Sequence, residues 1–86
     1  MDLIDFAMSC MLVSLKWRAS VTSWGRTEKR NTSVGGVPGS FHLNWLGMDV
    51  VLDDQKKDLA FERDCGIFGI TALYEVDHYH LQPKVI

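Results

Sequence analysis

The sequence has little of what would place it in several large classes of protein. It has no apolar stretch long enough to cross a membrane, and its net charge of −2 gives no electrostatic reason to bind nucleic acid. Its two cysteines, Cys10 and Cys65, are too far apart for a CxxC pair and too few for a disulfide framework. We therefore expect two buried free thiols, no membrane span and no nucleic-acid partner.

The apolar segment 1–17 also lacks the marks of a secretory signal peptide. It has no basic start, and no clean small-residue cleavage site follows it. Its apolar residues repeat at helical spacing, and these are Ile4, Met8, Met11, Leu12 and Leu15. We expect a core helix here, in a chain made in the cytoplasm without its own export signal.

The composition is that of one small globular domain, residues 1–86, with 47% hydrophobic and 23% charged residues. After the first helix, the pattern predicts a short strand over 19–24, a long glycine-rich loop over 25–39 and a buried strand over 41–52. A second helix is expected from Asp53 and Asp54 to about Cys65, then one final strand over 70–81 that Pro83 ends. This order predicts an α+β fold with a small antiparallel sheet and two helices on one side.

The three histidines fall in two short segments that also carry acids. His42 lies seven residues before Asp49 in SFHLNWLGMDVV, and His78 and His80 lie in EVDHYH. On a strand, His78 and His80 would point to the same face, because side chains alternate with period two. Histidine and aspartate both bind zinc, so these residues are candidate metal ligands.

A catalytic zinc takes three protein ligands and keeps one position for water. The metal lowers the pKa of that water towards ~7, and a nearby carboxylate can take its proton. Glu75 and Asp77 are both candidates for that carboxylate. Spacing alone also allows a reading without metal, in which His42 is a lone histidine and HYH lies on a surface strand.

The same segments resemble the signatures of one enzyme family. SFHLNWLGMDVV is similar to the pattern Ser-x-His-x-x-Gly-x-Ala-x-Asp of the D-Ala-D-Ala carboxypeptidase-type zinc metallopeptidases, and Ser40, His42 and Asp49 match it in place. EVDHYHLQ resembles the second signature, an acid followed closely by a ligand histidine. TSWGRTEKRN is similar to the upstream Ser-x-x-Arg-x-x-x-x-Asn segment. The family includes vancomycin-resistance dipeptidases, phage endolysin peptidases and hedgehog-like domains, and the resemblance covers about residues 22–82.

The resemblance implies a Zn²⁺ cofactor held by three ligands, which are His42, Asp49 and His80. It makes Asp77 the general base, since the family places its acid three residues before the ligand. A register shifted by two residues gives the pair His78 and Glu75 instead, and this alternative stays open. Arg26 should meet a substrate carboxylate or the developing oxyanion, and Ser40 is expected to contact substrate.

The implied function is a hydrolase: a peptidase that cuts peptidoglycan stem peptides in cell wall degradation, as an endolysin or virion-associated lytic enzyme does. We expect a monomer with a hedgehog/D-Ala-D-Ala-peptidase-like zinc fold that acts on the cell wall after release. Two positions depart from the family pattern, Trp45 at its Gly and Gly47 at its Ala. Trp45 and the short length of the domain favour the alternative of a non-catalytic zinc-binding module. A third reading is an α+β domain without metal that binds a partner through the 24–39 loop.

Overall fold

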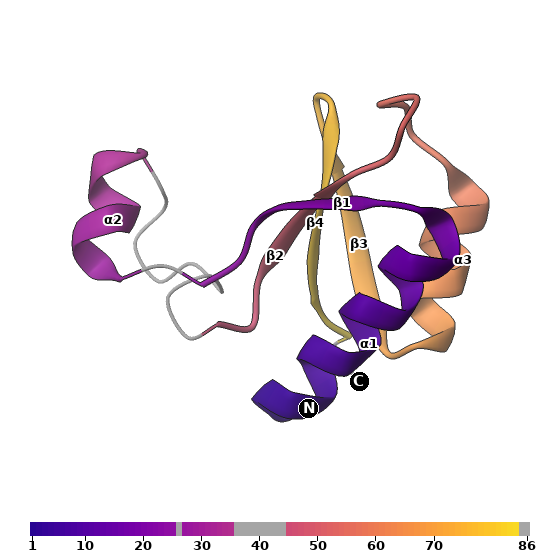
Figure 1. Cartoon of the computed structure of the whole chain (residues 1–86), viewed down its shortest axis with the longest axis horizontal. Helices are drawn as coiled ribbons and strands as arrows, with labels where there is room; N and C mark the ends of the chain where they lie inside the picture. Colours follow the sequence, from indigo (N-terminus) through magenta and orange to yellow (C-terminus); the bar gives the residue numbers. More distant parts are fainter. Residues whose placement is uncertain (26, 36–44, 85–86) are drawn as a thin grey trace.

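The computed structural model describes residues 1–25, 27–35 and 45–84. Its elements in chain order are α1 (Leu3–Trp17), β1 (Ser20–Ser23), α2 (Glu28–Ser33), β2 (Met48–Val51), α3 (Leu59–Ile67), β3 (Ile70–Glu75) and β4 (His78–Pro83). Figure 1 shows α1 and α3 on one side of the strands, whereas the short α2 lies apart from them on the other side.

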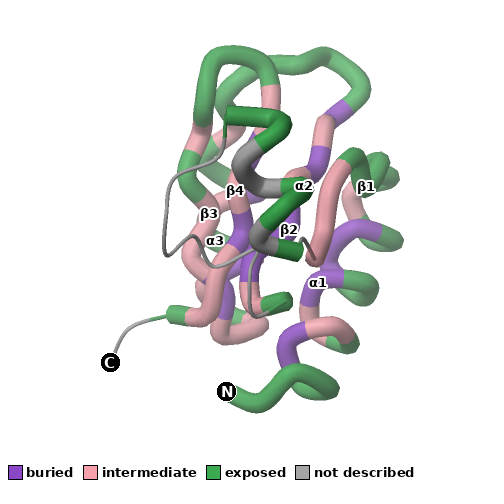
Figure 2. The backbone as a smooth tube through the Cα atoms, turned by 90° about the vertical axis from the view of Figure 1, so that its left-hand side faces the viewer, coloured by how far each residue is buried: buried purple, intermediate pink, exposed green. Residues whose placement is uncertain are grey.

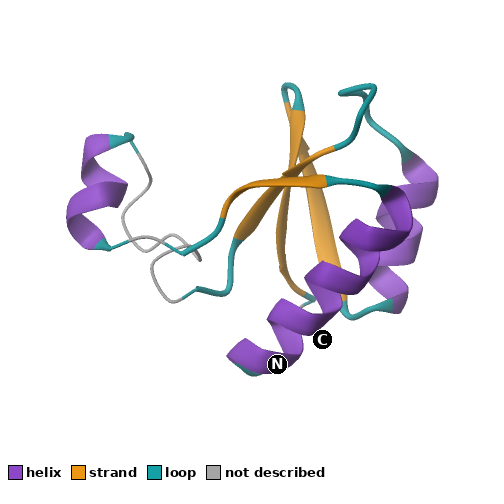
Figure 3. Cartoon of the chain, viewed as in Figure 1, coloured by secondary structure: helices purple, strands orange, loops and turns teal. Residues whose placement is uncertain are grey.

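The four strands form one sheet in the order β1-β2-β4-β3, and every neighbouring pair is antiparallel. β2 and β4 are therefore the central strands, although they are far apart in sequence. The layering is visible in Figure 3, with the orange strands beside the two longer purple helices. The predicted α+β class, with a small antiparallel sheet and two helices on one side, is confirmed.

The core lies between the helices and the sheet face that they cover. α1 contributes Phe6, Cys10 and Val13, α3 contributes Phe61 and Cys65, and the sheet contributes Met48, Val50, Ile70, Tyr79 and Leu81. Aromatic rings join the layers, since Phe61 contacts the ring of Trp17 edge-on and that of Tyr79 at a tilt. Both cysteines are free and buried, as expected.

The helix α1 is confirmed, but the side it buries is the opposite of the one predicted. Ile4, Met8, Met11, Leu12 and Leu15 are all exposed, and the core takes Phe6, Cys10 and Val13. The reason is that α1 carries two apolar stripes with the same helical period. Periodicity alone cannot decide which of them meets the core.

Three other boundaries differ from prediction. α3 begins at Leu59 rather than at Asp53 and Asp54, because Asp58 is its N-cap and its carboxylate accepts from two backbone N–H groups. The predicted loop contains α2, and the hydroxyl of Thr27, the residue just before this helix, accepts from the N–H of Arg30. β2 starts only at Met48, after Trp45 with a positive φ of 65°.

The last predicted strand is two strands joined by a hairpin turn. β3 and β4 pair from Ile70 with Pro83 to Glu75 with His78, so Val76 and Asp77 form the turn. Val76 has a φ of 59°, which a β-branched residue rarely adopts. The turn was missed because its sequence has no Gly or Asn to signal that conformation.

None of the described helices is both long and apolar enough to cross a membrane.

Candidate metal centre

The sheet has one apolar face and one polar face. Val50, Tyr79 and Leu81 are buried beneath α1 and α3, so the alternating residues of the same strands face the other way. Asp49, His78, His80 and Gln82 occupy this second face. The prediction that His78 and His80 share a face agrees with their positions on β4.

Asp49 and His80 lie directly opposite each other on the two central strands. Asp49 Oδ1 is 3.3 Å from His80 Nδ1, and the two side chains are only 18% and 13% exposed. Bond lengths around tetrahedral zinc place two ligand atoms roughly 3.3–3.5 Å apart. The spacing of this carboxylate and imidazole therefore fits two corners of a zinc site.

The second nitrogen of the His80 ring faces Gln82. His80 Nε2 lies 3.0 Å from Gln82 Oε1, and an amide oxygen can only accept a hydrogen bond. With Nε2–H as the donor, Nδ1 of the neutral ring presents a lone pair towards the Asp49 carboxylate. Two acceptors then face each other, an arrangement that a proton or a cation between them stabilises.

His78 differs from His80 because carboxylates flank both of its nitrogens. Its Nε2 is 3.3 Å from Glu75 Oε1, and its Nδ1 is 3.0 Å from Asp77 Oδ1. Burial lowers the pKa of His78, but the hydrogen bond to Asp77 and the nearby charges of Asp49 and Glu75 outweigh it and raise the pKa. A metal at either nitrogen of His78 would have to displace one of these two contacts with acids, which favours His80 over His78.

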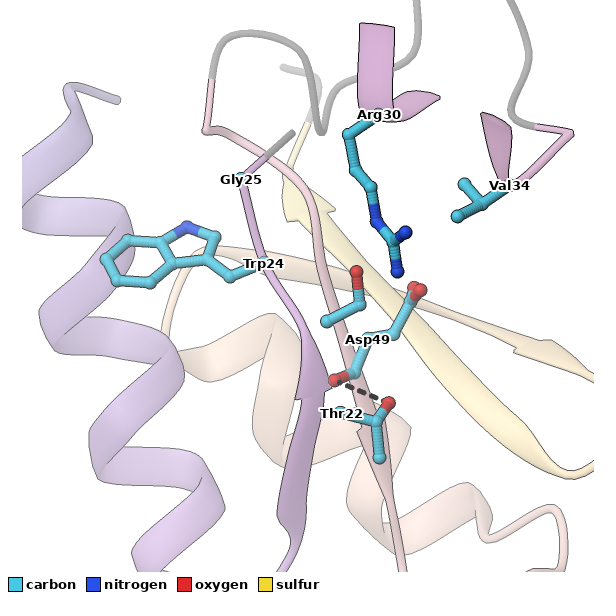
Figure 4. Close-up of a pocket in the computed structure, with 7 residues that line it drawn as sticks. Thr22, Trp24, Gly25, Arg30, Val34 and Asp49 are labelled. Carbon is cyan, nitrogen blue, oxygen red and sulfur yellow. Dashed lines mark hydrogen bonds between the residues drawn. The ribbon is translucent and has the colours of Figure 1, made fainter. Parts of the chain in front are cut away.

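A cavity of about 520 Å³ opens beside Asp49. Its lining comes from β1 and the residues after it, α2 and β2, and consists of Thr22, Ser23, Trp24, Gly25, Arg30, Val34 and Asp49. In Figure 4, the Arg30 guanidinium points towards the Asp49 carboxylate, and the dashed line marks the Thr22 hydroxyl donating to the Asp49 carbonyl at 3.3 Å. A cation thus faces the space next to the candidate ligand.

Trp45, the residue at the family's glycine position, does not line this cavity. Its ring packs edge-on against Trp24 with centroids 5.4 Å apart, its carbonyl accepts from the Trp24 indole N–H, and it is 47% exposed. A Cβ at position 25 would collide with the Trp45 ring, so Gly25 permits this packing. Of the two tryptophans, only Trp24 lines the cavity.

The structure thus brings together only part of the predicted site. Asp49 and His80 meet, and Glu75 and Asp77 flank His78. His42, Ser40 and Arg26 lie outside the described residues. Within the described ranges, no group of three or more histidine, cysteine or acidic side chains is placed to hold a metal.

Two residues of the site were not singled out from the sequence. Gln82 lies two residues after His80, so strand alternation was sufficient to place both on one face. No sequence pattern singled out Arg30, because its position depends on α2, a helix in the segment for which the pattern predicts a loop.

Comparisons of the chain with protein-family models, with curated proteins and with solved structures find no match. The resemblance to the zinc metallopeptidases therefore rests on the motif residues and their spacing.

Proposed function

We propose that the chain is a zinc-dependent peptidase, with a hedgehog/D-Ala-D-Ala-peptidase-like fold, that hydrolyses a peptide bond in peptidoglycan stem peptides. The observation that carries the proposal is the pair Asp49 and His80, opposed on the two central strands at 3.3 Å. The strand pairing fixes the positions of these two candidate ligands relative to each other before any metal binds.

In this proposal His42 completes the ligand set with Asp49 and His80. A bound zinc ion would supply an activated water and polarise the substrate carbonyl. Asp77 would be the general base, accepting a proton from the attacking water and returning it to the leaving amine. Arg26 holds a substrate carboxylate, and Ser40 contacts the substrate next to the first ligand. The activity is that of an endolysin or virion-associated enzyme acting on the cell wall.

The Gln82 amide oxygen supports the choice of His80 as ligand. Histidines that bind metals usually donate their second ring N–H to an acceptor, which fixes the ring and its tautomer. The 3.0 Å contact between His80 Nε2 and Gln82 Oε1 has this form.

One observation favours a non-catalytic zinc-binding module as the second candidate. Asp77 lies in the hairpin turn, is paired with His78 at 3.0 Å and is 63% exposed in its side chain. A carboxylate that is largely exposed and already in contact with a ring nitrogen is poorly placed to take a proton from an attacking water. In this alternative the metal would stabilise the fold without hydrolysis.

The test is metal content by mass spectrometry on the wild type and on Asp49→Ala, His80→Ala and His78→Ala, followed by hydrolysis of purified peptidoglycan. We expect about one zinc per chain, lost in the first two variants and retained in His78→Ala. A wild type without zinc would reject both candidates. Bound zinc without peptide release from any peptidoglycan preparation would select the non-catalytic module.

A further inference from the structure

The outer side of α1 is an unusually apolar surface. Ile4, Met8, Met11, Leu12 and Leu15 lie on this one helix and are each between 52% and 78% exposed. Figure 2 shows the same contrast along α1, where exposed green segments alternate with buried purple turns. Single exposed apolar residues are ordinary, but a contiguous group of this size marks an interaction site.

The spacing of these residues indicates which kind of structural element would pack against them. Ile4, Met8, Met11 and Leu15 follow one another at intervals of four, three and four. This is the spacing of a coiled-coil seam, in which each side chain inserts between residues of a facing helix. The buried stripe of α1 has the same spacing, and the protein's own core fills it. The outer stripe therefore fits a second helix.

The sequence of α1 also suits pairing with itself in the antiparallel direction. A two-fold axis midway along the stripe places Ile4 opposite Leu15, and Met8 opposite Met11, of the second copy. A symmetric interface must be self-complementary in this way. The seam residues meet only apolar partners, so no charge is buried.

The charges at the two ends of α1 agree with this direction. Asp2 and Asp5 lie at its start, whereas Lys16 and Arg18 lie at its end. Lys16 pairs with Asp64 at 2.7 Å, so Arg18 supplies the positive charge for a facing helix. Antiparallel pairing brings the acidic end of each helix near the basic end of the other, and parallel pairing would bring like charges together.

A hollow at the end of the stripe provides a receiving site. It measures about 340 Å³ and is lined by Met11, Ser14, Leu15, Arg18, Ala19 and Val21. In the antiparallel arrangement, Ile4 of the second copy reaches this end of α1. A branched apolar side chain suits a hollow whose walls are largely apolar.

In place of the monomer expected from the sequence, we propose that the outer face of α1 pairs with the same face of a second copy of the chain, in an antiparallel two-fold dimer. α1 and the Asp49–His80 pair lie on opposite sides of the sheet, so the two candidate metal centres of the dimer face outwards and stay open. The proposal is independent of the peptidase proposal, because it uses none of the same residues.

The first experiment is sedimentation velocity on the full chain between about 1 μM and 1 mM, a range that covers weak and moderate dimers. We expect a concentration-dependent dimer, and at least a tenfold weaker one for Met8→Glu, because each copy then carries a charge into the seam. Val76→Glu is the matched control: it adds the same charge at the hairpin turn, at a residue 91% exposed, and should leave the dimer unchanged. A monomer at every concentration, or equal weakening by both variants, overturns the proposal.

Disulfide trapping tests the direction of pairing, and because the crosslink is covalent it accumulates even from a weak dimer. Under mild oxidation, Ile4→Cys protein mixed with Leu15→Cys protein should give mainly mixed dimers, because the two positions face each other across the seam. Dimers of Ile4→Cys with itself, in equal or greater yield, would indicate parallel pairing and reject the proposal. Circular dichroism of each variant before oxidation verifies that the fold is retained.

Discussion

Gln82 Oε1 lies 3.0 Å from His80 Nε2, so an amide oxygen is placed to accept a hydrogen bond from the ring nitrogen of the candidate ligand that points away from Asp49. We expect Gln82→Ala to lower zinc affinity about 10- to 100-fold, the usual effect of losing a partner of a metal-bound histidine. Gln82→Glu keeps an acceptor at this place and should keep the affinity. Competition with a fluorescent chelator measures both, and equal affinity of Gln82→Ala and wild type would exclude this role.

The same contact can be examined without metal. Nitrogen-15 NMR of the apo protein distinguishes the two neutral tautomers of His80, and the wild type should carry its proton on Nε2. Loss of this preference in Gln82→Ala, at unchanged stability, would separate an effect on the ring from damage to the strand.

The two acids beside His78 allow a matched test of which one is the general base in the proposed proton-transfer step. Glu75 Oε1 and Asp77 Oδ1 lie 3.3 Å and 3.0 Å from its two ring nitrogens. We expect Asp77→Asn to lower kcat at least about 100-fold while zinc stays bound, within the range that general-base catalysis contributes. Glu75→Gln should lower it less than about tenfold. The reverse order would indicate the shifted register, with His78 as ligand and Glu75 as base.

Tyr79 joins the sheet to the start of α3 through its hydroxyl. The hydroxyl accepts from the Asp58 N–H at 2.7 Å and donates to Glu62 Oε2 at 2.8 Å, while the ring lies in the core. Tyr79→Phe should cost about 1–3 kcal/mol, because it leaves the Asp58 N–H without its partner. Tyr74→Phe, whose hydroxyl donates to exposed carbonyls, should cost less. Urea unfolding of the three proteins provides the comparison.

Ser14 is a buried polar residue whose hydroxyl makes no hydrogen bond within the described parts of the chain. Ser14→Ala should therefore stabilise the protein by about 1 kcal/mol, because it removes an unpaired desolvated group and places a better helix former in α1. Thermal unfolding would detect the gain. A loss of stability would mean that the hydroxyl is paired in solution.

The two buried thiols predict how stability changes with pH. Burial raises the pKa of both Cys10 and Cys65 to about 12, whereas unfolded thiols ionise near ~8.5. The folded state therefore binds these protons more tightly. This tighter proton binding stabilises the folded state fully below about pH 8.5, and the stabilisation is lost as the pH rises towards 12. The free energy of unfolding should fall more steeply between about pH 8.5 and 10 in the wild type than in Cys10→Ala.

Local patterns in the sequence predicted which segments form helices and strands better than they predicted which side of each element faces the core. The helix over 3–17 and the strand near 20–23 follow from spacing and composition. The orientation of α1 does not, because Phe6 and Ile4 belong to stripes of equal period. It is decided by Phe61 and Cys65, residues distant in sequence that pack against only one of the two stripes.

The candidate site was also predictable in part. Strand alternation placed His78 and His80 on one face, but the pairing of His80 with Asp49 depends on the strand order, which no local pattern specifies. The hairpin turn at Val76 and Asp77 could not be foreseen, because tertiary pairing holds Val76 at a positive φ against its own preference.

The position of Asp49 and His80 on the two central strands has a consequence for synthesis and folding. β3 and β4 can pair as a local hairpin, whereas β2 and β4 can pair only after the chain between them has closed into a loop. During translation the complete sequence of β2 is made well before β4 emerges. A growing chain therefore has the candidate ligand Asp49 before it has His80. At the proposed zinc site, capture of the ion would then coincide with closure of the sheet, and an incomplete chain would lack one of the two opposed ligands.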